Sequence, residues 1–441
     1  MDIFAMAGGT AWTVFFFIIA LSIIVFVHEY GHYIVGRWTG IHAEVFSLGF
    51  GPVLWSRHDR RGTRWQIAAI PFGGYVKFLG DADATSVTQG DVAGLSARER
   101  RHTMAGAPLW ARAATVAAGP VFNFILTFFL IGGMLIYTGV PREEMTVERL
   151  LPTPFVGPSL LPGDVILAMN GMAVPDAEGF GKVLEALPEA ASIDYTVRRD
   201  GAEVTVQGPH PLPPVAVMVL LRSAAMDAGL QEGDVILTAA GKDVTLFSQL
   251  PGIVAAGKGA PVPLTVWRDG KTFDVTLTPR IRSVQDDKGG FVDKYQIGLG
   301  GGLAFELANR QTGVWETVSL TGQAMWRLTT TTFSGLWHTV AGKISSCNFS
   351  GVIGMAETMG DAARSGLQTF VEMMAVLSLG VGILNLFPIP VLDGGHLVFH
   401  AYEAVVRRPP SARVLQVMMT AGLALVLSLM IFALSRDLVC V

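Results

Sequence analysis

Residues 12–32 read WTVFFFIIALSIIVFVHEYGH, an apolar run that ends in two histidines and a glutamate. In a helix, His28 and His32 lie one turn apart on the same face, so their imidazoles can bind one zinc ion together. Glu29 lies beside them and can accept a proton from an attacking water molecule. The alternative is a pair of helix-end histidines that face lipid headgroups. Ionisable residues are costly inside a segment apolar enough to cross a membrane, and this favours the interpretation as a zinc site.

The composition is typical of a membrane protein with a soluble insert. The chain has 441 residues, of which 51% are hydrophobic and only 15% are charged, whereas a soluble chain carries about 25% charge. The net charge of −4 argues against nucleic acid as a partner. Cys347 and Cys440 form neither a disulfide framework nor a C-x-x-C site, so a metal site must use histidines and carboxylates. The first apolar run lacks a basic leader and carries the metal motif, so we expect it to be retained.

Apolar runs predict four transmembrane helices, at about 12–35, 113–138, 370–387 and 414–434. The second contains Pro120, which predicts a kink or a packing adjustment, and Asn123, which predicts an inward-facing polar contact. Ten Lys and Arg residues lie in 37–112, and three more join the last two spans. Both segments are therefore predicted to be cytoplasmic, which places the insert and both termini on the far side of the membrane.

Residues 142 to about 300 are soluble in character and contain a repeat. PGDVIL at 162–167 recurs as EGDVIL at 232–237, and YTVRRDG at 195–201 recurs as LTVWRDG at 264–270. Each copy predicts strand, Gly-Asp turn, strand, helix, strand, Asp-Gly hairpin and strand. The insert resembles a tandem of PDZ domains. Ala228-Gly229-Leu230 in the second copy fits a peptide-binding PDZ domain, but the first copy has Ser159-Leu-Leu-Pro162 there, which argues against peptide segments as its partners.

The predicted fold class is thus a polytopic α-helical membrane protein with four transmembrane helices, a membrane-associated β-sheet and two inserted PDZ-like α/β domains. In the connecting region, Trp315, Trp326 and Trp337 recur at 11-residue spacing, which suits either an amphipathic surface helix or a packed one. The predicted divisions are the first transmembrane helix (1–36), the β region (37–112), the second transmembrane helix (113–140), the first and second PDZ-like domains (141–210 and 211–285), the connecting region (286–368), the third transmembrane helix (369–400) and the last loop with the fourth (401–441).

A zinc ion held by two histidines needs a third protein ligand and an open position. Asp393 is the candidate, because it follows the third span and is predicted at the same membrane face as His28. A helix cap at the interface is the alternative interpretation of this residue. His396 and His400 form a rival pair, but no glutamate lies beside them and neither lies in an apolar span.

These motifs together resemble those of the site-2 protease family, over nearly the whole chain. The resemblance rests on His28-Glu-x-x-His32, Gly49-Phe-Gly-Pro52, Pro71-Phe-Gly-Gly-Tyr-Val-Lys77, Gly119-Pro-x-x-Asn123 and Asn385-x-x-Pro-x-Pro-x-Leu-Asp-Gly-Gly-His396. Val352 departs from it, because relatives usually have proline there; this concerns the local turn rather than the site.

The resemblance implies an intramembrane zinc metalloprotease of the bacterial inner membrane. Its partners would be the lipid bilayer and single-span membrane proteins such as anti-sigma factors, which it cleaves in regulated intramembrane proteolysis. The family implies one zinc ion held by His28, His32 and Asp393, with Glu29 as the base. It also implies substrate contacts near Asn385 and Pro388.

The segment between the first two spans predicts strands at 43–48, 64–70 and 75–79, with Gly73 and Gly74 separating the last two. An open edge of this sheet could accept an unwound substrate segment as a further strand. The run before Pro71, which includes Ala68, is the predicted edge. Ala68, Gly73 and Gly74 are therefore candidate substrate contacts, and Asn123 in the second span is a further candidate. The alternative is a sheet with a purely structural role.

Two other function classes compete with the protease. One is a PDZ-based membrane scaffold with a vestigial metal site, which the intact His28, Glu29, His32 and Asp393 disfavour. The other is a soluble-type zinc protease tethered to the membrane. That interpretation requires the metal motif in the soluble part, whereas here it ends the first span.

Overall fold

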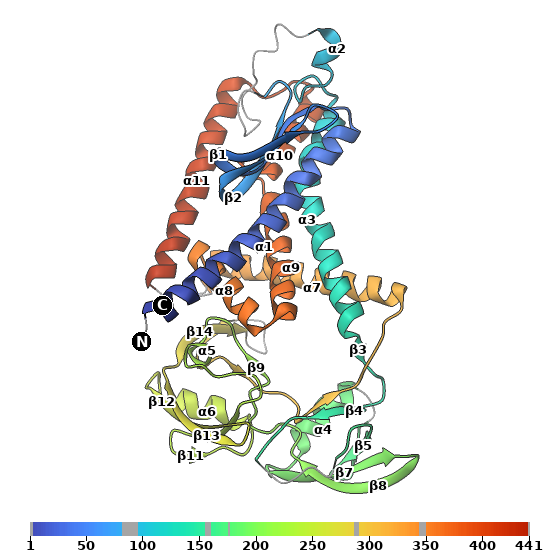
Figure 1. Ribbon diagram of the computed structural model, residues 1–441, viewed down its shortest axis with the longest axis vertical. Helices are drawn as coiled ribbons and strands as arrows, with labels where there is room; N and C mark the ends of the chain where they lie inside the picture. Colours follow the sequence, from blue (N-terminus) through green and yellow to red (C-terminus); the bar gives the residue numbers. More distant parts are fainter. Residues whose placement is uncertain are drawn as a thin grey trace. The chain divides into compact units, whose positions relative to one another are not determined.

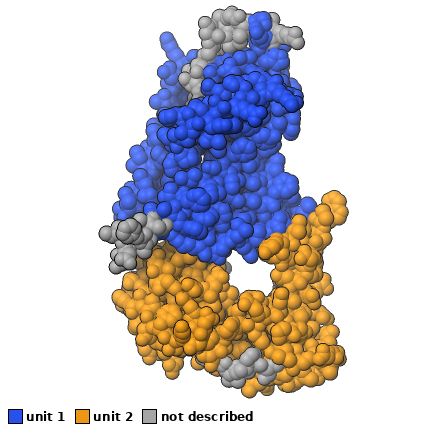
Figure 2. Space-filling view, viewed as in Figure 1, with its two compact units in different colours: residues 1–134, 318–337, 349–441 blue, residues 135–317, 338–348 orange. Residues whose placement is uncertain are grey.

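The computed structural model describes residues 3–81, 96–154, 160–174, 177–285, 291–343 and 350–439. The chain divides into two compact units, coloured separately in Figure 2. Unit 1 comprises residues 1–134, 318–337 and 349–441, and unit 2 comprises 135–317 and 338–348. Unit 1 holds the metal motif, and unit 2 holds the repeated segment.

Four helices in the described residues are long and apolar enough to cross a membrane (Figure 1). They are α1 (Ile3–Trp38), α3 (Leu109–Thr138), α9 (Leu367–Asn385) and α11 (Ala412–Val439). A helix is the expected form, because it pairs the backbone groups within the segment and so leaves none unsatisfied in hydrocarbon. The prediction of four candidate membrane helices is confirmed.

The other helices of unit 1 are α2 (Ala97–Arg100), α8 (Val352–Ser365), α10 (Asp393–Val406) and most of α7 (Val314–Val340). Helix α1 packs against α8 and α9 through a buried cluster that includes Phe17, Ile24, Met359 and Phe370. Val352 is the first residue of α8. Proline favours a helix start but is not required there, so the departure at this position leaves the helix intact.

The sheet of unit 1 consists of two long, bent strands, β1 (Ala43–His58) and β2 (Arg64–Phe78), beside the C-terminal half of α1 (Figure 1). Residues 45–48 pair with 74–77 on one side and with 64–67 on the other, and 53–58 pair with 64–68. The two outer segments of the sheet are therefore 53–58 and 74–78.

This register corrects two predictions. The runs at 64–70 and 75–79 are parts of one strand, because Gly73 adopts a φ of +114° and bends the chain without ending β2. The run before Pro71 is not an open edge: Ala68 pairs with Val53 and is only 4% exposed.

In unit 2, each copy of the repeat forms a four-stranded antiparallel sheet with a helix between its second and third strands in chain order, and the second copy has a further short helix before its first strand. The strand orders are β6-β5-β7-β8 and β11-β10-β12-β13, so the two copies have the same topology. The first copy comprises β5 (Val165–Met169), β6 (Met172–Ala173), α4 (Ala177–Ala186), β7 (Ser192–Arg199) and β8 (Ala202–Pro209). The second comprises α5 (Ala224–Asp227), β10 (Val235–Ala239), β11 (Lys242–Asp243), α6 (Gln249–Ala256), β12 (Val262–Arg268) and β13 (Lys271–Leu277).

The repeated Gly-Asp and Arg-Asp-Gly motifs meet in space in both copies. Asp164 is buried and accepts two hydrogen bonds from Arg199, at 2.8 and 2.7 Å. Asp234 and Arg268 repeat this contact at 2.5 and 2.7 Å. Each aspartate also accepts the backbone N–H three residues earlier, so one side chain connects the Gly-Asp turn to the neighbouring strand.

Short strand pairs complete unit 2, and they contribute to the core of both copies. These strands are β3 (Val140–Pro141), β4 (Val147–Leu150), β9 (Met218–Val219), β14 (Arg280–Gln285), β15 (Phe291–Gln296), β16 (Leu299–Gly300), β17 (Phe305–Leu307) and β18 (Asn309–Arg310). Ile297 is buried in the core of the second copy, and Phe305 is buried in that of the first. Both cores thus include residues beyond the predicted limit at 285.

Helix α7 exposes all three of its regularly spaced tryptophans. Trp315, Trp326 and Trp337 are 84%, 68% and 68% exposed. Their side chains are therefore not packed in a core of this chain.

Candidate metal centre

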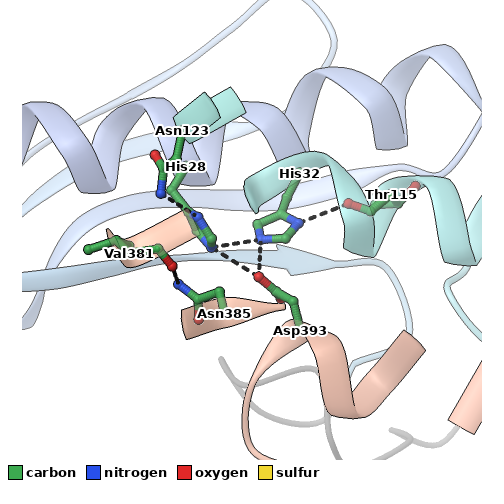
Figure 3. Close-up of polar contacts among 7 residues, drawn as sticks. All are labelled: His28, His32, Thr115, Asn123, Val381, Asn385 and Asp393. Carbon is green, nitrogen blue, oxygen red and sulfur yellow. Dashed lines mark hydrogen bonds and ion pairs between the residues drawn. The ribbon is translucent and has the colours of Figure 1, made fainter. Parts of the chain in front are cut away.

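Helices α1 and α10 bring together three side chains that could hold a metal ion (Figure 3). His28 and His32 lie one turn apart on α1, with 3.2 Å between their Nε2 atoms. Asp393, the first residue of α10, places Oδ2 3.1 Å from His28 Nε2 and 3.5 Å from His32 Nε2. The ligand atoms of the three residues all lie within 4.8 Å of one another.

Helix α3 orients both imidazoles. His32 Nδ1 lies 2.9 Å from the Thr115 carbonyl oxygen, which can only accept, so Nδ1 carries the hydrogen and the Nε2 lone pair faces Asp393. Asn123 is fully buried, with its side-chain amide 3.2 Å from His28 Nδ1. When His28 binds a metal through Nε2, Nδ1 must donate. A rotation of the Asn123 amide by half a turn then supplies Oδ1, which is buried and has no partner, as the acceptor.

The arrangement of these atoms fits a bound cation. Two imidazole nitrogens and a carboxylate oxygen converge within 4.8 Å of one another. When both imidazoles are neutral and carry their hydrogen on Nδ1, the Nε2 lone pairs and the carboxylate repel one another unless a positive charge lies among them. Asp393 Oδ2 is also buried with no hydrogen bond of suitable geometry. Two imidazoles and one carboxylate are a donor set that suits catalytic zinc, with the fourth position left for water or substrate.

Two glycines allow α1 and α3 to approach closely at the centre. A Cβ on Gly31, inside the metal motif, would lie 2.5 Å from the Ala118 carbonyl oxygen. A Cβ on Gly119 would lie 2.3 Å from His32 Nε2 and 2.8 Å from His28 Cε1. Both distances are shorter than van der Waals contact, so only a hydrogen fits at either position.

Sequence reasoning did not assign a role at this site to Gly119 or Thr115. Gly119 was visible as part of the Gly-Pro-x-x-Asn motif, which is a signal of close helix packing. Thr115 contributes a backbone carbonyl, which every residue has, so no sequence signal could have found it.

A cavity of about 380 Å³ adjoins the three ligands. Glu29 lines it, and so do Gly74 and Val76 of β2. A Cβ on Gly74 would lie 3.1 Å from Glu29 Cγ, and the Val76 backbone amide faces the Glu29 carboxylate. The outer segment of β2 therefore runs alongside the candidate base.

Of the other predicted substrate contacts, some line this cavity and others do not. Asn385, at the end of α9, lines it and donates from Nδ2 to the Val381 carbonyl at 3.1 Å (Figure 3). Gly73 adjoins Gly74 but is not part of the lining, and Pro388 is exposed in the turn that follows α9.

Two predicted contacts are inaccessible to a substrate, and this corrects their proposed role. Asn123 is fully buried and its amide is occupied by His28. Ala68 lies inside the sheet, as described above. Of the rival histidines, His396 and His400 line the cavity, but the group of three ligand atoms does not include them.

Comparison with known proteins extends over nearly the whole chain. The sequence profile of peptidase family M50 matches residues 16–429. A protein from Agrobacterium fabrum that carries the name zinc metalloprotease is 34% identical over 430 residues, which cover 96% of this chain and 94% of that protein. The regulator of sigma-E protease RseP of Salmonella typhimurium is 33% identical over 453 residues, which cover 97% of this chain and 98% of that protein.

The candidate metal centre and the comparisons with known proteins both point to metal-dependent peptide hydrolysis. Two histidines and an aspartate offer three ligand atoms, and a glutamate lies beside them. Of the two matching proteins, one carries the name zinc metalloprotease and the other the name protease. The chain is therefore a zinc metalloprotease of the site-2 type and belongs to peptidase family M50.

Proposed function

We propose that this enzyme hydrolyses peptide bonds in or near the transmembrane segments of single-span membrane proteins, such as anti-sigma factors. The observation that carries the proposal is the position of His28, Glu29 and His32 on α1, one of the four candidate membrane helices. A substrate bond must then reach the centre at the depth of the membrane. The name of the Salmonella relative, a regulator of sigma-E, supports this class of substrate.

The complete ligand set disfavours the alternative, a PDZ-based membrane scaffold with a vestigial metal site. A vestigial site would be free to lose a ligand, the base or the glycine that admits the imidazoles. Here His28, His32 and Asp393 converge, and Gly119 leaves room for the two rings.

Zinc, when bound, lowers the pKa of water and polarises the scissile carbonyl. Glu29 takes the proton from the attacking water and delivers it to the leaving amine. Asn385 uses one amide hydrogen on Val381, so its second hydrogen and its oxygen are available to hold extended substrate backbone. Thr115 and Asn123 keep the two imidazoles oriented throughout the reaction.

A transmembrane substrate presents a further problem, because a helix hides its peptide bonds in its own hydrogen bonds. The outer segment 74–78 of β2 pairs with β1 on one side only and lines the cavity beside Glu29. An unwound substrate segment that adds there as a strand exchanges its helical hydrogen bonds for sheet bonds. This segment takes the place of the run before Pro71 as the substrate-binding edge.

Strand addition predicts a cross-linking pattern with a period of two residues. Tyr75 lines the cavity, so we place a cysteine there in a Glu29→Gln background that leaves the substrate uncut. Cysteines scanned along a single-span substrate should then form disulfides at alternate positions around the cleavage site. A bound helix would instead give a repeat of three to four residues, and this result would disprove strand addition.

Trp55 provides the matched control position for this experiment. It is 52% exposed and lies on the other outer segment, 53–58, which does not line the cavity. A cysteine at Trp55 should form no disulfide with the substrate. Both native cysteines, Cys347 and Cys440, are replaced by serine in these variants.

We further propose that the sheet and α7 contact the bilayer. The sheet exposes Leu54, Trp55, Ile67 and Ile70, which are 71%, 52%, 45% and 49% accessible. These apolar side chains suit lipid better than water. The three exposed indoles of α7 suit the membrane interface, where tryptophan is enriched.

The proposed location is the bacterial inner membrane, with residues 37–112 in the cytoplasm and the repeated segment in the periplasm. The distribution of basic residues supports this orientation. In a variant without native cysteines, Ser248→Cys should react with a membrane-impermeant thiol reagent in intact spheroplasts. Ser96→Cys should react only after lysis. Labelling in the reverse order would refute the orientation.

We infer that the two copies in unit 2 are PDZ-like domains. Their common topology and the repeated aspartate–arginine contact support this assignment. Ala228-Gly229-Leu230 lies in the second copy only, so a bound peptide segment is expected there. Superposition of residues 215–304 on a solved PDZ domain tests the assignment, and a different strand order would contradict it.

A further inference from the structure

A bidentate ion pair connects the helix that orients the two histidines to the helix that carries the third ligand. Arg112, in the first turn of α3, donates from Nη1 to Glu403 Oε2 at 3.0 Å and from Nη2 to Oε1 at 2.6 Å. Glu403 lies in the last turn of α10. The two side chains are only 17% and 20% exposed, so solvent screens their attraction less than it would at the surface.

The ion pair connects α3 and α10, whose relative position determines whether the centre can form. Helix α3 contacts both imidazoles, through Thr115 and Asn123. Helix α10 begins with Asp393, whose carboxylate must meet those imidazoles. A rotation or shift of α10 relative to α3 would therefore move Asp393 away from the two Nε2 atoms.

Helices α3 and α10 border a common cavity at this point. Arg112, Thr115 and Val116 of α3 line the same cavity as Phe399, His400 and Glu403 of α10. Open volume thus separates the helices where close-packed side chains would otherwise set their spacing. The ion pair spans this part of the structure.

The charges around Glu403 make Arg112 its necessary partner. A carboxylate near the C-terminus of a helix is disfavoured by the helix dipole, so it needs a cation. Burial, and then the nearby Arg112 guanidinium, lower the pKa of His400 to about 4, so that imidazole is neutral at pH 7. His400 therefore does not compete with Arg112 for the carboxylate.

At the N-terminal end of α10, two glycines allow a close contact with the preceding turn. A Cβ on Gly394 would lie 2.3 Å from the carbonyl oxygens of Leu386 and Phe387, and one on Gly395 would lie 2.3 Å from that of Ile389. The start of α10 is thus pressed against the turn that follows α9. This contact and the Arg112 pair act at opposite ends of the helix, and together they determine its direction.

We propose that Arg112 and Glu403 are positioning residues for the zinc centre, which hold α10 at the angle that presents Asp393 to His28 and His32. Neither residue is a metal ligand or contacts the reacting atoms. The proposal concerns metal binding and holds whichever membrane proteins the enzyme cleaves.

The test measures zinc affinity in the purified full-length protein by competition with a chelator, so it needs no substrate. Arg112→Gln and Glu403→Gln should each weaken zinc binding by about tenfold, the lower end of the range for loss of an orienting group. The double variant should bind zinc no more weakly than either single variant, because both changes remove the same interaction. Cleavage of a substrate can fail or succeed independently of this result.

Arg310→Gln is the matched control, because Arg310 makes a bidentate pair with Glu316 at 2.9 and 2.7 Å in unit 2. It should leave zinc affinity unchanged. Either single variant with normal zinc affinity would overturn the proposal, as would a double variant whose loss equals the product of the two single losses.

If a single variant fails to fold, a charge-reversed double variant, Arg112→Glu with Glu403→Arg, tests whether the ion pair positions Asp393. A positioning pair predicts zinc affinity within about threefold of the unmodified protein, because the contact is restored in the opposite sense. Zinc binding as weak as in the neutral double variant would show that the contact does not position Asp393.

Discussion

Glu29→Gln is expected to lower the rate of cleavage by about 10²–10⁴-fold while the protein still binds zinc normally. Glutamine has nearly the shape of glutamate, so it should fit the same space between α1 and β2. It cannot accept the proton of the attacking water, and none of the three metal ligands is changed. The measurement combines metal analysis of the purified protein with cleavage of a single-span substrate in proteoliposomes.

Glu372→Gln is the matched control for this substitution. Glu372 lies on the candidate membrane helix α9, is exposed, and accepts a hydrogen bond from Gln368 at 2.9 Å. This variant should cleave at the normal rate. Normal turnover by Glu29→Gln would rule out Glu29 as the base and with it the proposed mechanism.

Asp393→Ala is expected to lose both zinc and activity, with zinc affinity reduced by more than about 100-fold. Loss of an orienting group alone costs roughly 10–100-fold, and this change removes a ligand itself. The variant also leaves two imidazole nitrogens 3.2 Å apart without the carboxylate that balances the metal charge. Metal analysis after dialysis against a mild chelator measures the loss directly.

His396→Ala is the comparison that makes this result specific. His396 lines the same cavity, three residues further along α10, but is not among the converging ligands. It should keep its zinc. If instead Asp393→Ala retained zinc and His396→Ala lost it, the third ligand would be His396, the candidate that the structure leaves outside the centre.

Local periodicity explains why the first half of the centre is evident from the sequence. His28 and His32 meet because any helix brings residues four apart to one face, and the apolar run around them requires a helix in a membrane. The same reasoning finds the four candidate membrane helices from hydropathy alone. The repeat in unit 2 is likewise evident from the sequence, since both copies use the same Gly-Asp and Asp-Gly turns.

The strand order of the sheet in unit 1 could not be predicted from the sequence. Alternation of side chains indicates which residues are strands, but strand order depends on pairing between distant residues, which no local pattern specifies. Pro71 suggested that the run around Ala68 was an edge. The register instead places that run between two neighbours and leaves 74–78 on the outside.

Sequence reasoning favoured Asp393 over His396, because no glutamate lies beside that histidine and it lies outside the apolar spans. The sequence does not show how Asp393 reaches His28 and His32, which depends on the direction in which α10 starts. That direction depends on contacts such as Arg112 with Glu403, which are 291 residues apart. The sequence by itself therefore determined the membrane class and the repeat, and it indicated the three candidate ligands. The convergence of Asp393 on the histidines, the open strand and the groups that orient the imidazoles depend on how distant segments pack, which only the folded chain establishes.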